Sequence, residues 1–138
     1  QLAAVAIAAG HAEAILDQAV AYGRDRRQFG KSILSFEALR EKIAGIFSVA
    51  VNAATSWCVL GELAATGKAN RAQAYAARTQ ASEALLGAAD ACLQIHGGYG
   101  FSSEYPAERF YRDAMTLVAE DQGPDGARLT IAGDVLDS

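Results

Sequence analysis

Two short segments of the sequence combine residue types that can bind an anionic, partly aromatic ligand. The first, Arg26-Arg27-Gln28-Phe29-Gly30-Lys31, places guanidinium groups, an amide and an aromatic ring beside a flexible glycine. A guanidinium donates paired hydrogen bonds to a phosphate, and an aromatic face stacks on a planar ring. The alternative is a solvated charged turn with Phe29 tucked into the core, and spacing alone favours this alternative.

The second segment, Gln94-Ile95-His96-Gly97-Gly98-Tyr99-Gly100-Phe101, contains three glycines. Glycines let backbone N–H groups approach a ligand that a Cβ would exclude. Gly97 also stands where a Schellman-type stop would end a helix, and the two interpretations are about equally supported. We assign no catalytic role to His96, because a lone histidine at a helix end is more often structural.

Two adjacent carboxylates, Glu120 and Asp121, follow an apolar run and precede Gly123-Pro124. Either carboxylate can act as a general base from a loop, or can serve as an anion at the start of the next helix. Spacing alone favours the helix-start role. Upstream, Glu108 and Arg112 have the i,i+4 spacing of a helical ion pair.

Composition predicts one soluble domain over residues 1–138, since 138 residues with 51% hydrophobic content can bury one core. A net charge of −4 with mixed signs argues against nucleic-acid binding. Cys58 and Cys92 lack metal-ligand spacing, so we expect buried free thiols, no metal site and a reducing, cytoplasmic location. Residues 1–9 lack the features of a signal peptide or membrane anchor, and the chain opens like a fragment cut within a helix.

Helical periodicity predicts an all-α antiparallel bundle of three long helices and two short ones, and no segment is a confident strand. In the second helix, with Ser35 as N-cap, we expect Phe47 and Trp57 to belong to the buried stripe. The expected helices span about Leu2 to Tyr22, Ser35 to Leu63, Ala74 to Ile95, Pro106 to Leu117, and Pro124 to Asp137.

Three motifs, in this order and at this spacing, resemble the acyl-CoA dehydrogenases over nearly the whole chain. They are the Arg26 to Lys31 segment, the Gln94 to Phe101 segment, and Pro106-Ala107-Glu108-Arg109-Phe110-Tyr111-Arg112-Asp113-Ala114. The resemblance implies a carboxyl-terminal helical domain in a flavin-dependent, tetrameric enzyme. The amino-terminal helical domain and the middle β domain of that family are absent from this chain.

The resemblance also implies that two groups of residues contact the FAD of a neighbouring subunit. They are Arg26, Gln28 and Phe29 in the first segment, and Gln94, Gly97 and Gly98 in the second. The implied reaction is α,β-desaturation of an acyl-CoA, with an electron-transfer flavoprotein as the expected electron acceptor. A carboxylate removes the α-proton, and the β-hydrogen leaves as hydride to the flavin.

Counting from Asp113 places the family's catalytic glutamate at Asp121, where this sequence departs from the usual Tyr-Glu-Gly-Thr-like segment. The carboxylate is withdrawn by roughly an ångström, enough to lower the rate by orders of magnitude unless the backbone compensates. Glu120 has the right side chain but is displaced by one residue. In some relatives the base lies at a position just upstream of Gln1.

Several versions of the function remain open. The favoured one is a noncatalytic subunit of a heterotetramer, slightly ahead of a self-sufficient enzyme using Asp121, Glu120 or an upstream glutamate. A helical assembly module without flavin binding is one alternative. A related flavin oxidase with Asp121 as base is another. We expect the chain alone to be inactive and expect no membrane insertion.

Overall fold

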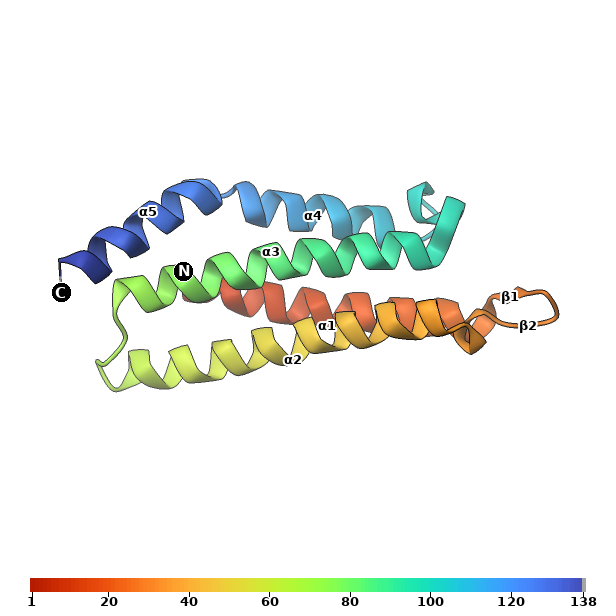
Figure 1. Ribbon diagram of the computed structural model, residues 1–138, viewed down its shortest axis with the longest axis horizontal. Coiled ribbons are helices and arrows are strands. Elements are labelled where there is room, and N and C mark those ends of the chain that lie inside the picture. Colours follow the sequence, from red (N-terminus) through yellow and green to blue (C-terminus); the bar gives the residue numbers. More distant parts are fainter. Residues whose placement is uncertain (138) are drawn as a thin grey trace.

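The computed structural model describes residues 1–137, which form a bundle of five α-helices. Successive long helices run in opposite directions, and α4 returns along α3 before α5 continues toward the carboxyl end (Figure 1). The prediction of an all-α antiparallel bundle with three long and two short helices is therefore confirmed. The helices are α1 (Leu2–Asp25), α2 (Glu37–Ala65), α3 (Arg71–His96), α4 (Ala107–Ala119) and α5 (Gly123–Leu136).

A seam of small and branched side chains joins α1 to α3, which run in the same direction. Along each helix, residues at alternating spacings of three and four face one side, which is the geometry of a packed helical stripe. Small side chains at these positions let the two backbones approach closely. The buried members are Val5, Ala8, Ala12, Ile15 and Ala19 from α1, and Ala81, Leu85, Ala88, Cys92 and Ile95 from α3.

A hairpin of two-residue strands follows α1, in the segment between the first two predicted helices. β1 (Arg27–Gln28) pairs antiparallel with β2 (Lys31–Ser32). Phe29 at φ 53° and Gly30 at φ 78° form the turn. Positive φ at both central residues matches the right-handed twist of a tight hairpin. The sequence did not predict these strands because each is too short to show an alternating pattern.

The start of α2 differs from the prediction. Ser35 is not the N-cap, because it closes a short 3₁₀ turn, Ile33–Ser35, and its hydroxyl donates to the Ser32 carbonyl over 2.7 Å. Phe36 precedes the helix and makes no side-chain cap. The Ser32 hydroxyl instead accepts the N–H of Leu34 at the start of the 3₁₀ turn.

Three residues of α2 predicted to be buried are exposed. Phe47 is 56% exposed, Trp57 is 39% exposed, and Cys58 is also exposed. Their helical period was read correctly, but α2 has neighbours on only one side, so its apolar surface is wider than the bundle covers (Figure 1). By length and composition alone α2 can cross a membrane, and 17% of its apolar window is buried. A single helix of this kind is weak evidence for a membrane span, because core helices of soluble proteins and signal sequences pass the same test.

An aromatic junction locks the end of α3 against α1. The His96 ring is 2% exposed and stacks on Tyr22 at a centroid distance of 4.1 Å. Tyr105, just before α4, meets both rings edge to face. The Tyr22 hydroxyl donates to the His96 carbonyl over 3.2 Å. This junction fixes the place where the glycine segment leaves α3.

The His96 imidazole is also held through both nitrogens. Nδ1 lies 2.8 Å from the Cys92 carbonyl, so we assign the proton to Nδ1 because a carbonyl only accepts. Nε2 then accepts from the Gln18 amide at 3.2 Å. Burial lowers the pKa of His96 below its ordinary value of 6.5, and the bond to Cys92 opposes that shift. The folded state therefore favours the neutral form of His96.

Leu85→Ala tests the α1–α3 seam. Leu85 is 0% exposed, so the truncation leaves a cavity and should lower the free energy of unfolding by about 2–5 kcal/mol. Leu129→Ala in α5, where the side chain is 76% exposed, is the matched control and should change it by less than about 0.5 kcal/mol. If urea denaturation shows equal losses of the free energy of unfolding for the two variants, the proposed stabilising role of the seam is contradicted.

The junction predicts a pH dependence carried by His96. Since its pKa is lowered on folding, the unfolded chain binds more protons than the folded chain just below pH 6.5. Stability should therefore be complete above that pH and fall as the pH decreases toward the lowered pKa of the folded state. Unfolding measured between about pH 7.5 and about pH 5 should show a smaller loss for His96→Gln than for the unsubstituted protein. Identical losses of stability in the two proteins would show that His96 does not contribute to the pH dependence.

Candidate functional site

The hairpin carries three of the predicted cofactor-binding residues to one end of the bundle, where it extends beyond the helices (Figure 1). Phe29 is 90% exposed at its tip, so the interpretation that this ring packs into the core is wrong. Its positive φ turns the side chain outward, and the nearest ring, Phe36, is 6.3 Å away. Gln28 is exposed too, and Arg26 is half-buried at the base.

The glycine segment lies at the same end, directly after α3. Gly97 has φ 58° and ψ −135°, so its backbone requires glycine, although this is not the left-handed conformation of a Schellman stop. A short 3₁₀ helix, Gly97–Phe101, follows instead. Gly100 also needs to be glycine, since a Cβ would lie 2.7 Å from the Leu93 carbonyl oxygen.

Gly98 has no such structural explanation. It is exposed, its φ is outside the range that disfavours side chains, and an added Cβ would meet nothing within 4 Å. Gln94, on the last turn of α3, is also exposed. The open space at Gly98 leaves room for a ligand or another chain to approach the backbone closely. Gly98 is therefore compatible with the functional interpretation of this segment.

A contact between Arg26 and Tyr99 joins the two segments. The guanidinium carbon of Arg26 lies 5.4 Å from the centroid of the Tyr99 ring, within the range of a cation–π contact. Tyr99 follows Gly98 directly, so this contact links the base of the hairpin to the glycine segment. The structure thus gathers all six predicted cofactor-binding residues at one end of the bundle.

Asp121 and Glu120 lie far from this surface, between α4 and α5. The side-chain amide of Gln1, the residue just before α1, donates a hydrogen bond to the Asp121 carboxylate over 2.9 Å. Arg26 follows the last residue of the same 24-residue helix, and a rise of 1.5 Å per residue separates the two ends by about 36 Å. The structure therefore does not bring the two candidate bases together with the six cofactor residues.

The two carboxylates differ in how freely they can be presented. Asp121 is exposed and has φ 62°, a conformation that is strained for most residues but tolerated by aspartate. Glu120 is exposed, but its carbonyl accepts a 2.6 Å hydrogen bond from Arg78. A loop tied at its backbone cannot easily rearrange to exchange the two side chains, so Asp121 is the better placed candidate.

Arg78 is a residue that the sequence analysis missed. It lies on α3, is 3% exposed, and also donates to the Leu117 carbonyl over 3.3 Å. A cation is favoured beside the free carbonyls at the carboxyl end of a helix, here α4. The available signal was an arginine within an Ala-rich helical stripe, where a charge needs a specific partner.

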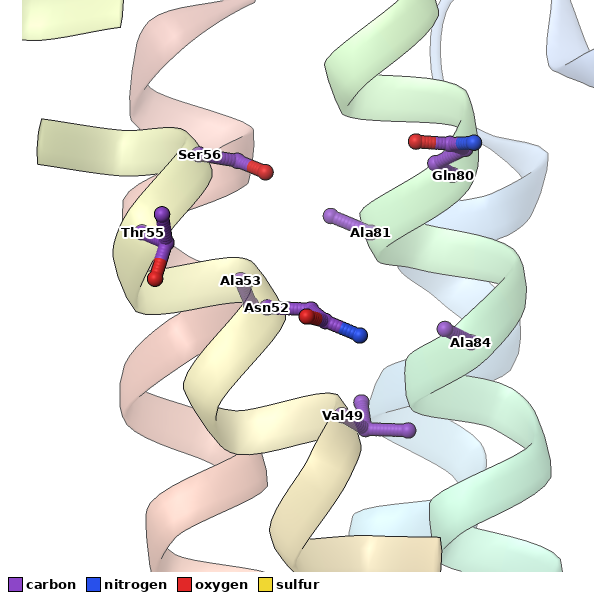
Figure 2. Close-up of a pocket in the computed structure, with 8 residues that line it drawn as sticks. All are labelled: Val49, Asn52, Ala53, Thr55, Ser56, Gln80, Ala81 and Ala84. Carbon is purple, nitrogen blue, oxygen red and sulfur yellow. The ribbon is translucent and has the colours of Figure 1, made fainter. Parts of the chain in front are cut away.

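A groove between α2 and α3 is less suited to chemistry. Asn52 and Ser56 point from α2 toward α3 across this groove (Figure 2). Its lining contains no ionisable side chain, so it offers no general acid or base. The lining residues are Val49, Asn52, Ala53, Thr55, Ser56, Gln80, Ala81 and Ala84. Among the residues described, 1–137, no group of three or more His, Cys, Asp or Glu side chains could hold a metal ion.

The arrangement offers two separate chemical capacities. At the hairpin end, a guanidinium, an exposed ring, a side-chain amide and open glycine backbone suit a phosphate-bearing ligand with a flat ring. At the other end, the exposed Asp121 carboxylate can accept a proton or a hydrogen bond. Because the two ends lie about 36 Å apart along α1, one ligand-binding centre within this chain does not use both.

Comparison with known proteins identifies the family of this chain. Residues 2–136 match the family model described as acyl-CoA dehydrogenase, C-terminal domain. Glutaryl-CoA dehydrogenase from Desulfococcus multivorans is 38% identical, over 99% of this chain and 35% of that protein. A subunit of the caffeyl-CoA reductase-Etf complex from Acetobacterium woodii is 32% identical, over 92% of this chain and 34% of that protein.

Solved structures show the same fold. Butyryl-CoA dehydrogenase from Megasphaera elsdenii superposes with a TM-score of 0.85 at 30% identity, over 98% of this chain and 35% of that one. The chain spans about a third of the length of the relatives it matches, 34–35% in these three. On the evidence of the family model, the sequence relatives and the fold, the chain belongs to the acyl-CoA dehydrogenase family, whose C-terminal helical domain it matches.

Proposed function

We propose that this domain completes the FAD site of a neighbouring subunit in an acyl-CoA dehydrogenase-type flavoprotein. The observation that carries the proposal is the gathering of six residues at the hairpin end of the bundle. Five of them are exposed and Arg26 is half-buried, so a neighbouring subunit or its ligand can reach them. The residues are Arg26, Gln28, Phe29, Gln94, Gly97 and Gly98.

The residues fit a dinucleotide cofactor. Arg26 suits the diphosphate, because guanidinium groups bind phosphate oxygens through several N–H donors. Phe29, which is 90% exposed, offers a ring face to the adenosine part. Gly98 leaves room for the ligand to reach the backbone, since nothing lies within 4 Å of a Cβ built there. Bound FAD would supply the acceptor for a hydride from the substrate β-carbon.

The proposed reaction is the α,β-desaturation of an acyl-CoA, in which a carboxylate takes the α-proton. Asp121 is the candidate for this role in a self-sufficient enzyme, because Arg78 holds the backbone carbonyl of Glu120 and so opposes the loop rearrangement that Glu120 would need. The caffeyl-CoA reductase relative shows that family members also act in the reducing direction. The same relative belongs to an Etf complex, which supports an electron-transfer flavoprotein as the redox partner.

We favour the version in which this domain belongs to a noncatalytic subunit that completes a partner's flavin site in a heterotetramer. The hairpin-end residues are retained, whereas the base position holds an aspartate with a shorter side chain at φ 62°. The shorter side chain moves the carboxylate back by about an ångström, which is enough to impair proton transfer. The cytoplasmic location stays a prediction.

The outer face of α2 supports an oligomer. Phe47, Val51, Ala54 and Cys58 are exposed and recur at spacings of four, three and four residues. An apolar stripe of this kind is costly in water and is suited to packing against a helix of another subunit. We propose that this stripe contributes to the tetramer interface.

Gly98→Ala tests the flavin contact without disturbing the fold. Because the added methyl meets nothing within 4 Å in the domain, the thermal midpoint should stay unchanged. If FAD approaches this backbone, the methyl should raise the dissociation constant of FAD by about tenfold or more in the assembled protein. Gly10→Ala, also free of contacts and located within α1, is the matched control. Unchanged FAD affinity in Gly98→Ala would contradict the proposed contact.

Asp121→Asn tests whether this carboxylate is the base. The amide keeps the size of the side chain and can still accept from Gln1 through its oxygen, but it cannot take a proton. In the noncatalytic version, turnover of the assembled heterotetramer should stay within about twofold. A fall of about a hundredfold or more would identify Asp121 as the base and overturn that version.

A further inference from the structure

We propose that Tyr99 is a positioning residue that holds the Arg26 guanidinium in place for the FAD diphosphate. This inference rests on the proposed function, and it adds a residue that none of the six assigned contacts includes. Tyr99 acts through Arg26, whose guanidinium carbon lies 5.4 Å from its ring centroid.

The backbone of Arg26 is fixed from both sides. Its N–H donates to the Tyr22 carbonyl over 2.9 Å, and its carbonyl accepts from Ile33 over 3.0 Å. The side chain still has several rotatable bonds, and a ligand must restrict them on binding. A ring that already holds the guanidinium removes part of that entropic cost before the ligand arrives.

The contact with Tyr99 leaves Arg26 able to bind an anion. A cation–π contact uses no hydrogen-bond acceptor, so the N–H donors of the guanidinium stay free. Within residues 1–137, no carboxylate lies within 4.0 Å of these nitrogens. Arg26 is therefore restrained but has not been neutralised by a partner.

Tyr99 is itself supported from behind. Its ring centroid lies 6.0 Å from that of Tyr105, which packs edge to face on Tyr22 at 5.2 Å and on His96 at 5.3 Å. Tyr99 thus connects the surface of the hairpin end to the buried junction. Since 44% of Tyr99 remains exposed, its replacement removes little core packing.

A double-mutant cycle separates this role from a structural one. The complete subunit in its native assembly is prepared without flavin and titrated with FAD at fixed ionic strength, with flavin fluorescence as the signal. The variants are Tyr99→Leu, Arg26→Ala and the double variant, and Tyr99→Phe is the conservative control. Tyr99→Gln, which also lacks an aromatic face, replaces Tyr99→Leu if that variant does not fold.

Tyr99→Leu should raise the FAD dissociation constant by about two- to fivefold, the size expected for an exposed cation–π contact. Tyr99→Phe should bind FAD as the unsubstituted protein does, because it keeps the ring face. In the Arg26→Ala background, Tyr99→Leu should have no further effect, since the group through which it acts is gone.

Three results would overturn the inference. If Arg26→Ala weakens FAD binding but Tyr99→Leu does not, Tyr99 has no positioning role, and the proposed function survives. If the two effects add, Tyr99 acts on the glycine segment and not through Arg26. If Arg26→Ala itself leaves FAD affinity unchanged, the proposed flavin contact of Arg26 fails, and the inference fails with it.

Discussion

The close packing of α1 on α3 determines where every functional group in this domain lies. Their shared seam is built from side chains that are buried at alternating spacings of three and four, and alanine is frequent among them. Small side chains bring two backbones near each other but leave little freedom for them to slide, because each knob has a defined hole. The two long helices therefore act as one rigid rod with a defined rotation about its axis.

This rod separates two kinds of chemistry. At one end, the stacking of Tyr22 on His96 joins the helices where the hairpin and the glycine segment emerge. At the other end, Gln1, just before α1, and Arg78 on α3 contact the loop between α4 and α5. The length of α1 sets the distance between them at about 36 Å. A single chain thus presents the proposed cofactor contacts and a candidate carboxylate at different places, as a domain shared between adjacent sites would.

The bundle and its helix ends were largely predictable because helical periodicity and Gly and Pro positions are local signals. The exposed face of α2 was not, since periodicity marks an apolar stripe but does not say which neighbour covers it. That ambiguity explains why Phe47, Trp57 and Cys58 were wrongly predicted to be buried. The hairpin was missed because two-residue strands carry no pattern.

The six predicted cofactor residues came from family resemblance, and only the structure could show that they lie at one end of the bundle. Spacing alone left Gly97 and Gly98 equivalent, whereas the backbone angles and free space distinguish a structural glycine from one that the fold does not require. Arg78 and Tyr99 escaped notice for a related reason. Their roles depend on contacts with segments distant in sequence, which no local pattern records.

Cross-linking from the hairpin tip tests the central claim, contact with a neighbouring subunit, most directly. A photoreactive phenylalanine analogue replaces Phe29, which is 90% exposed, in complete subunits prepared with light or heavy nitrogen and then mixed during assembly. The account predicts cross-linked peptide pairs that combine one light and one heavy chain, with a yield that changes when FAD is bound. Pairs formed only within light or within heavy chains would show that the hairpin serves its own subunit, and would contradict the account.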